Sequence, residues 1–263
     1  MVEQSERPAG APLRVQVQLL AVRILLKTVR DPMVWLPNLI FSVFLLLAFD
    51  GILGEAVAPL TGGNYLNFLV PLIILMAAFA GGHAGFALVT DKDSGFFRRQ
   101  LAMPLARPAI VLGPMVAGAI QILVQSVVVL TLALIMGLDP AAGPSGVLLV
   151  LALAMLWGLA YAGYTVAMGL KARSAQAAES STIIAFLVLF LSPIFLPKDD
   201  LQEWMQVVVT INPVTYLLEA MRSLTIDGWE AGPLLRGFAV ALALAAAMLG
   251  WATRVARRVT SPS

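Results

Sequence analysis

Six long stretches of this sequence contain no Asp, Glu, Lys or Arg, with the single histidine, His83, counted as neutral. Crossing about 30 Å of hydrocarbon takes roughly 17–25 helical residues. The next-longest uncharged stretch has only 15 residues. The sequence therefore predicts an all-α polytopic membrane protein whose six transmembrane helices lie within residues 32–254. The stretches are Pro32–Phe49, Ala56–Thr90, Pro108–Leu138, Pro140–Leu170, Ser180–Pro197 and Gly237–Thr253. We expect the helices near 33–53, 65–90, 110–137, 145–170, 180–197 and 235–254.

The residue content argues against most catalytic chemistry in this chain. Charged residues make up 12 % of the sequence, against about 25 % in soluble domains, which argues against a water-soluble fold. The absence of cysteine and the single histidine leave no thiolate site and no basis for a metal centre or a histidine-based triad. An ATP-binding loop needs Gly before Lys, but the lysines follow Leu26, Asp91, Leu170 and Pro197. We expect a non-catalytic chain that binds no cofactor.

The distribution of Lys and Arg predicts the orientation in the membrane. If both termini lie on one side, that side holds 14 of the 17 cations, whereas the other side holds three cations and nine acids. Cytoplasmic loops are enriched in Lys and Arg, so we expect both termini in the cytoplasm. Residues 1–12 and 255–263 are then a flexible N-terminus and a cytoplasmic tail. The polar start argues against a cleaved signal peptide. The excess of Arg over Lys, with the many Ala, Val and Leu residues, points to a GC-rich bacterial genome, so we expect the bacterial plasma membrane.

Residues 13–31 have the pattern of an amphipathic helix. At 100° per residue, Gln16, Arg23, Lys27 and Arg30 fall on one face and apolar residues on the opposite face. Such a helix can lie in the membrane interface with its cations toward phosphate headgroups. The alternative is the solvated face of an ordinary helix.

The cytoplasmic connection after the second span predicts a short helix. Ser94 can cap a helix over about 95–103, and Pro104 would end it. Projecting from two long spans, this helix is suited to contact a cytoplasmic partner. A simple positively charged loop is the alternative.

The external segment 198–235 contains two apolar stretches, Leu201–Ile211 and Val214–Leu224, that are too short to cross a membrane. Asn212 and Pro213 favour a turn between them, so we expect a helical hairpin that dips into the outer leaflet. Glu219 and Arg222 are three residues apart and can pair on the second helix. An exposed external loop is the alternative.

A few polar residues lie within the predicted spans. Gln121 and Gln125 share one face of the third span, and Tyr161 and Tyr164 lie in the fourth. They can line a transport pathway or form hydrogen bonds between helices. Small residues surround His83 and let another helix approach closely, so we favour an interhelical hydrogen bond there over a proton relay.

Two motifs resemble those of the membrane subunits of type-2 ATP-binding-cassette exporters, in particular the daunorubicin and multidrug-resistance permeases. The first is Asp-Lys-Asp-Ser-Gly at 91–95, followed by Met-Pro-Leu-Ala-Arg at 103–107 and Gly113. The second is Asn-Pro-x-x-Tyr-x-x-Glu-Ala-x-Arg at 212–222. The resemblance covers nearly the whole chain. Asp91 and Asp93 stand where the family more often has Glu, and Pro114 stands where Lys is frequent, which can alter the start of the third span.

The resemblance implies half of a pump, in which two permease chains, identical or related, form the pathway. Two separate ATPase subunits, which bind ATP and magnesium, dock beneath them through the helix at 91–105. The residues implied in this coupling are Asp91, Asp93, Gly95, Arg98, Arg99, Pro104 and Arg107. We take Asp91, Asp93, Arg98 and Arg99 as the ATPase contact. The implied hairpin residues are Asn212, Pro213, Tyr216, Glu219 and Arg222.

The predicted cargo is a hydrophobic or amphiphilic compound such as a drug, antibiotic or lipid. Aromatic residues make up only 8 % of the chain, which fits an apolar compound better than a sugar chain gliding over rings. Export of a polysaccharide or lipid-linked glycan is the first alternative. An ion-coupled secondary transporter and an integral membrane transferase are the others, although the spans lack the acidic residues that ion coupling usually uses.

Overall fold

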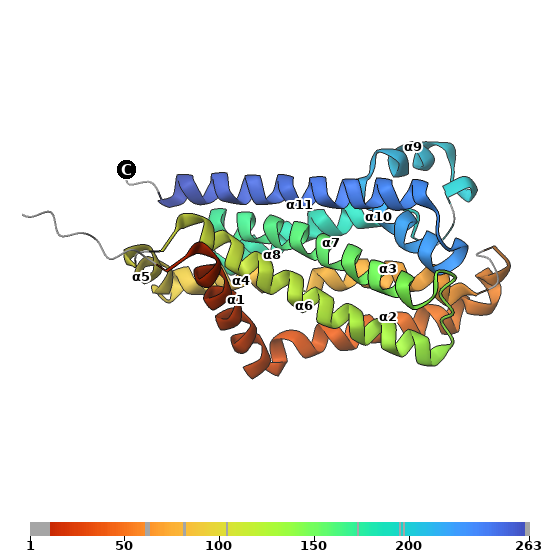
Figure 1. The fold of residues 1–263 in the computed structure, drawn as a ribbon, viewed down its shortest axis with the longest axis horizontal. Helices are drawn as coiled ribbons and strands as arrows, with labels where there is room; N and C mark the ends of the chain where they lie inside the picture. Colours follow the sequence, from red (N-terminus) through yellow and green to blue (C-terminus); the bar gives the residue numbers. More distant parts are fainter. Residues whose placement is uncertain are drawn as a thin grey trace, which may run out of the picture.

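The computed structural model describes residues 11–60, 64–80, 83–103, 105–172, 174–194, 196 and 198–260, and every regular element in these ranges is helical. The longest helices run side by side along one axis (Figure 1). At one end of this bundle lie α5 and the C-terminal end of α11, with α1 crossing obliquely; α9 lies at the opposite end (Figure 1). The elements are α1 Leu13–Arg30, α2 Pro32–Val57, η1 Ala58–Leu60, α3 Tyr65–Ala80, α4 His83–Asp93, α5 Phe96–Ala102, α6 Arg107–Met136, α7 Gly143–Lys171, α8 Ala175–Phe190, η2 Lys198–Asp200, α9 Glu203–Ile211, α10 Pro213–Arg222, η3 Ser223–Asp227 and α11 Ala231–Thr260.

Each of the six predicted spans coincides with helical structure. Four helices among the described residues are long and apolar enough to cross a membrane: Trp35–Val57, Arg107–Met136, Gly143–Lys171 and Ala231–Val259. The other two positions hold shorter apolar helices, Tyr65–Ala78 and Gln176–Phe190. The structure thus establishes an all-helical chain with four candidate spans.

The predicted helix at 65–90 is covered by α3 and α4, and residues 81–82 between them lie outside the described ranges. Two predicted boundaries were wrong. The helix expected at 180–197 is α8, which ends at Phe190, shortly before Pro193, since proline disfavours helical backbone in the preceding residue. The last helix continues through 255–260, which we expected to be tail, because cations near a helix C-terminus are favoured. Residues 1–10 and 261–263 lie outside the described ranges.

The helix α7 lies at the centre of the bundle, against α4, α6 and α11. Its approach to α4 is so close that a Cβ added to Gly85 would lie 2.2 Å from the main-chain oxygen of Thr165. A Cβ added to Gly169 would lie 2.4 Å from the oxygen of Gly85. The predicted close helix contact in the small-residue region is therefore confirmed. The side chain of His83 lies outside the described residues.

The main apolar core lies between α3, α6, α7 and α10. Leu72, Ile73 and Leu153 are fully buried in it, and the indole N–H of Trp157 donates to the main-chain oxygen of Leu75 at 3.0 Å. This core holds the central helices as one unit. The functional elements at the two ends are built on it.

Candidate functional site

A bidentate ion pair fastens α1 to α4. Arg23 donates from Nη1 to Oδ2 of Asp91 at 2.9 Å and from Nη2 to Oδ1 at 2.8 Å. The guanidinium carbon of Arg23 also lies 3.8 Å from the centre of the Phe96 ring on α5. The Asp91 side chain is only 8 % exposed, whereas that of Arg23 is 35 % exposed, so the carboxylate is sheltered and the guanidinium stays partly open to water. We call this three-residue contact the clamp; Arg23 and Asp91 are 68 residues apart, and the sequence analysis did not pair them.

The clamp limits which side chains of residues 91–105 are exposed to a partner protein. Asp91 was predicted to contact the ATPase, but it is buried against Arg23. Phe97 and Gln100 also face inward from α5. Asp93 and Arg99 are exposed, so of the predicted contact residues these two lie at the surface.

The short helix is present, but its start differs from the prediction. Gly95, not Ser94, precedes α5, with a φ of 72° in the left-handed region that glycine adopts readily. The Ser94 hydroxyl donates instead to the main-chain oxygen of Asp91 at 3.3 Å. Arg98 lies on α5 with a side chain outside the described residues, and Pro104 lies outside them altogether.

Lys92 connects the same segment to the end of α7. Its ammonium donates to the main-chain oxygens of Gly169, at 2.8 Å, and Leu170. A cation at a helix C-terminus satisfies orphan carbonyls and is favoured by the helix dipole. Burial lowers the pKa of Lys92, and the nearby Asp93 opposes this shift. A residue that the sequence analysis left unassigned therefore fixes α4 to α7.

A second contact holds α1 to the start of α6. The buried amide of Gln16 accepts a hydrogen bond from the N–H of Ala106 at 2.7 Å and donates to the oxygen of Ala11 at 2.6 Å. Further along, a Cβ added to Gly113 would lie 2.5 Å from the Cβ of Leu20. The helix α1 is thus held at both ends of the segment 91–106, at Asp91 through Arg23 and at Ala106 through Gln16.

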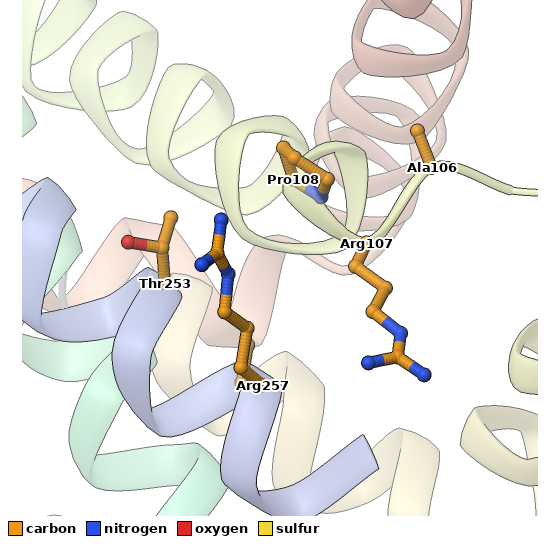
Figure 2. A pocket seen from close by; sticks show the side chains of 6 residues that line it. Ala106, Arg107, Pro108, Thr253 and Arg257 are labelled. Carbon is orange, nitrogen blue, oxygen red and sulfur yellow. The ribbon is translucent and has the colours of Figure 1, made fainter. Parts of the chain in front are cut away.

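Arg107 lies beside a cavity of about 650 Å³ between the start of α6 and the end of α11. Figure 2 shows Arg257 reaching from α11 toward the first turn of α6, and Arg107 pointing away from that turn. A cation at a helix N-terminus is opposed by the helix dipole, by about 0.3–1 kcal/mol. Two arginines, Arg107 and Arg257, thus line this cavity. It is lined by Ala106, Arg107, Pro108, Thr253, Ala256 and Arg257.

At the opposite end, α9 and α10 form the predicted pair of short helices. The Asn212 side chain accepts from the N–H of Val214 at 3.0 Å and donates to the oxygen of Val188 at 2.6 Å. Pro213 occupies the first turn of α10, where its missing N–H costs nothing. The Tyr216 hydroxyl donates to the oxygen of Thr210 at 2.7 Å. Asn212, Pro213 and Tyr216 therefore define the turn between the two helices.

Arg222, at the end of α10, is buried. It donates to the main-chain oxygens of Phe68 at 3.2 Å, Pro193 at 2.6 Å and Ile194 at 2.9 Å. Its guanidinium carbon lies 3.3 Å from the centre of the Phe68 ring. The predicted pair with Glu219 is absent among the described residues at a cut-off of 4.0 Å. The guanidinium instead supplies donors to one carbonyl group within α3 and to two that follow α8.

The polar residues of the spans fall into two groups. Gln121 and Gln125 donate toward α1 and α2 and line a cavity with them. Tyr161 is 2 % exposed, with its ring near those of Trp157 and Tyr164. The Tyr164 hydroxyl donates to the oxygen of Ser181 at 2.6 Å.

The two glutamines therefore lie at a cavity, whereas the two tyrosines belong to helix contacts. Pro114 is buried within α6, which runs on through it from Arg107. The start of this helix is thus not interrupted at Pro114.

Comparison with known proteins matches this chain to one family of transporters and to several transport permeases. The sequence profile of the family described as ABC-2 type transporter matches residues 15–226. A daunorubicin resistance ABC transporter permease protein of Streptomyces coeruleorubidus is 25 % identical over 237 residues, which cover 88 % of this chain and 83 % of that protein. A probable doxorubicin resistance ABC transporter permease protein of Mycobacterium tuberculosis is 24 % identical over 214 residues, covering 81 % and 78 %. A putative transport permease of Pyropia yezoensis is 28 % identical over 221 residues, covering 80 % and 73 %.

Proposed function

Because this chain belongs to the ABC-2 type transporter family, as a non-catalytic membrane permease whose ATPase is a separate subunit, we propose that it exports a hydrophobic or amphiphilic compound. The drug-resistance permeases among its relatives support this cargo class. The partner ATPase subunits would bind the nucleotide and magnesium. We further propose two permease chains and two ATPases in each complex.

The proposed topology has six spans, formed by α2, α3 with α4, α6, α7, α8 and α11, and both termini in the cytoplasm of a bacterial cell. The partition of Lys and Arg between the two ends supports this orientation. The hairpin of α9 and α10 would then face the outer leaflet. Trp204, Val207 and Ile211 on α9 are exposed apolar residues, as expected of a helix that contacts lipid.

The proposed coupling element is α5 with the clamp beneath it. The observation that carries this proposal is the bidentate contact of Arg23 with Asp91, because it joins the short helix region to α1. An ATPase that moves α5 would therefore move α1 as well. Asp93 and Arg99 would contact the ATPase directly, and the arginine cavity at Arg107 would receive an acidic group of the same subunit.

Reversing the charge of α5 should uncouple ATP hydrolysis from export. The double variant Arg98→Glu, Arg99→Glu places like charges against any acidic ATPase surface, and we expect export to fall at least about tenfold, corresponding to roughly 1.4 kcal/mol. Membrane insertion should remain unchanged. The measurements are drug efflux from intact cells and ATPase activity of the purified complex. Arg236→Glu, an exposed arginine at the other end of the bundle, is the control, and unchanged efflux in the double variant would refute the assignment.

The cargo proposal predicts which compounds stimulate the ATPase of the assembled complex. Amphiphilic drugs such as daunorubicin should raise the rate of ATP hydrolysis, because cargo and ATPase are coupled through the same complex. Lipid-linked glycans should leave it unchanged. Stimulation by glycans alone would favour polysaccharide export, and efflux that resists vanadate but stops with an uncoupler would favour a secondary transporter.

A further inference from the structure

A separate cavity lies where α1 and α2 meet α6. The inference drawn from it concerns the cargo of the exporter and rests on the proposed export function. The volume of the cavity is about 400 Å³, within the roughly 300–1,000 Å³ of small-molecule sites. Val29, Trp35 and Val124 are exposed at its rim. The lining is apolar except for a few polar groups. It consists of Leu25, Thr28, Val29, Trp35, Asn38, Leu39, Ile120, Gln121, Val124, Gln125 and Val128.

The hydrogen bonds of Gln125 fix the orientation of its amide. Its nitrogen lies 3.2 Å from the main-chain oxygen of Asn38 and 2.8 Å from the Ser42 hydroxyl. The main-chain oxygen has no proton to give, and Ser42 already donates its own proton to that same oxygen at 3.1 Å. Both neighbours can therefore only accept from Gln125. The amide nitrogen must face them, which leaves Oε1 of Gln125 as an acceptor.

The same reasoning applies to Gln121, one helical turn earlier. Its amide nitrogen lies 2.8 Å from the Thr28 hydroxyl. That hydroxyl donates its only proton to the oxygen of Ile24 at 3.1 Å. Thr28 must therefore accept from Gln121, and Oε1 of Gln121 is left as the second acceptor. Residues four apart lie on the same helix face, so both oxygens belong to the face of α6 that lines the cavity.

Neither amide oxygen accepts a hydrogen bond from the described part of the chain. A polar group in apolar surroundings gains most from a partner that supplies what it lacks. Hydroxyl and protonated amino groups supply donors, whereas phosphate and carboxylate groups offer only acceptors. The two amide oxygens therefore favour a ligand group that donates hydrogen bonds.

We propose that this cavity binds, from the bilayer, an apolar compound that carries a hydroxyl or amino group. The donor bonds to Oε1 of Gln121 or Gln125, and the apolar body lies against Leu25, Leu39 and Ile120. A compound that carries such a donor fits this chemistry better than phosphatidylcholine, whose headgroup has no hydrogen-bond donor. The proposal thus names a hydrogen-bond donor as the cargo feature that the permease recognises.

The test compares two probes that differ in one hydroxyl group, 1-pyrenebutanol and 1-butylpyrene. The purified full-length chain is reconstituted into phosphatidylcholine nanodiscs without ATPase or nucleotide, and binding is followed by energy transfer from tryptophan to pyrene. The measured quantity is the ratio of the two affinities, pyrenebutanol over butylpyrene. We expect this ratio to be about tenfold higher for the wild type than for the Gln121→Met, Gln125→Met double variant, which has lost both amide oxygens. Comparing this ratio between the two proteins cancels the difference in membrane partitioning. Trp35→Phe should lower the transfer, since Trp35 lines the cavity.

Gln176→Met, which replaces an exposed glutamine on α8, is the matched control and should keep the wild-type preference. If the double variant does not fold, Val124→Trp, which fills the cavity from its rim, should abolish binding of both probes. Equal preference in the wild type and the double variant would overturn the proposal. So would spontaneous disulfide dimers of Val124→Cys in membranes, since the natural chain has no cysteine and such dimers would place a second copy over the cavity.

The binding assay contains no ATPase, so it separates the two proposals. Donor preference in the nanodiscs without drug efflux by the complex would support this cavity and count against export. Efflux without donor preference would do the reverse.

Discussion

Replacing Arg222 by alanine is expected to destabilise the protein more than any other single charge removal. The change leaves the main-chain oxygens of Pro193 and Ile194, after the end of α8, without their donor, and it takes one donor from the oxygen of Phe68 within α3. Each buried acceptor left unpaired costs about 1–3 kcal/mol, so we expect a loss of about 3 kcal/mol or more. For a chain of this size, a loss of this order lowers Tm by roughly 10 °C. The measurement is thermal unfolding of the purified protein in detergent.

Two further variants sharpen the Arg222 prediction. Arg222→Lys should recover only part of the stability, because an ammonium is a point charge and cannot span three carbonyl groups as a guanidinium fork does. Arg236→Ala removes an exposed arginine whose Nε donates to the oxygen of Gly232 within its own helix. It should change the free energy of unfolding by less than about 0.5 kcal/mol. Equal Tm values for Arg222→Ala and Arg236→Ala would contradict the structural role.

Removing the clamp should have the largest effect on transport. In Asp91→Ala, Arg23 loses a bidentate partner, and charge-assisted hydrogen bonds are worth about 1.5–3 kcal/mol. If α1 must follow α5, drug efflux should fall by about ten- to a hundredfold, while the amount of protein in the membrane stays within about twofold of the wild type. ATPase activity of the complex should persist but lose its response to drug.

A charge exchange distinguishes the ion pair from a general loss of stability. The double variant Arg23→Asp, Asp91→Arg restores opposite charges at the same positions and should recover part of the efflux that each single variant loses. Lys27→Asp, one turn further along α1 and exposed, is the matched control and should retain efflux. Additive losses in the double variant, without recovery, would show that the pair is not the functional contact.

The sequence predicted the approximate positions of the apolar helices, because charge spacing along the chain reflects the cost of placing ions in hydrocarbon. Four of the six predicted spans are long and apolar enough to cross a membrane. The sequence also predicted the two short helices around Asn212 and the short helix near Arg99. These features depend on local patterns. The end of α8 at Phe190 was missed, because the uncharged run that reaches Pro197 marks the length of the apolar segment and not the residue at which its helix ends.

The contacts that define the site could not be predicted, since they join distant parts of the chain. Asp91 and Arg23 both have the appearance of surface charges in the sequence, and only the crossing of α1 over the bundle brings them together. Arg222 was assigned to Glu219 by its spacing on one helix. Its actual partners are main-chain oxygens, of Phe68 within α3 and of Pro193 and Ile194 after the end of α8, and such long-range contacts are not visible in a charge pattern.

The single continuous helix α1 places two distant events on one rigid body. Arg23, which holds the clamp, and Thr28, which lines the amphiphile cavity, are five residues apart, or about 7.5 Å along the helix axis. If α1 moves as a rigid body, a displacement of Arg23 also displaces Thr28. Thermodynamic reciprocity then requires that a compound in the cavity change the affinity for the ATPase by the same factor as the ATPase changes the affinity for the compound. Binding of cargo would thus be coupled to binding of the ATPase through α1, without a conformational change in the central helices of the bundle.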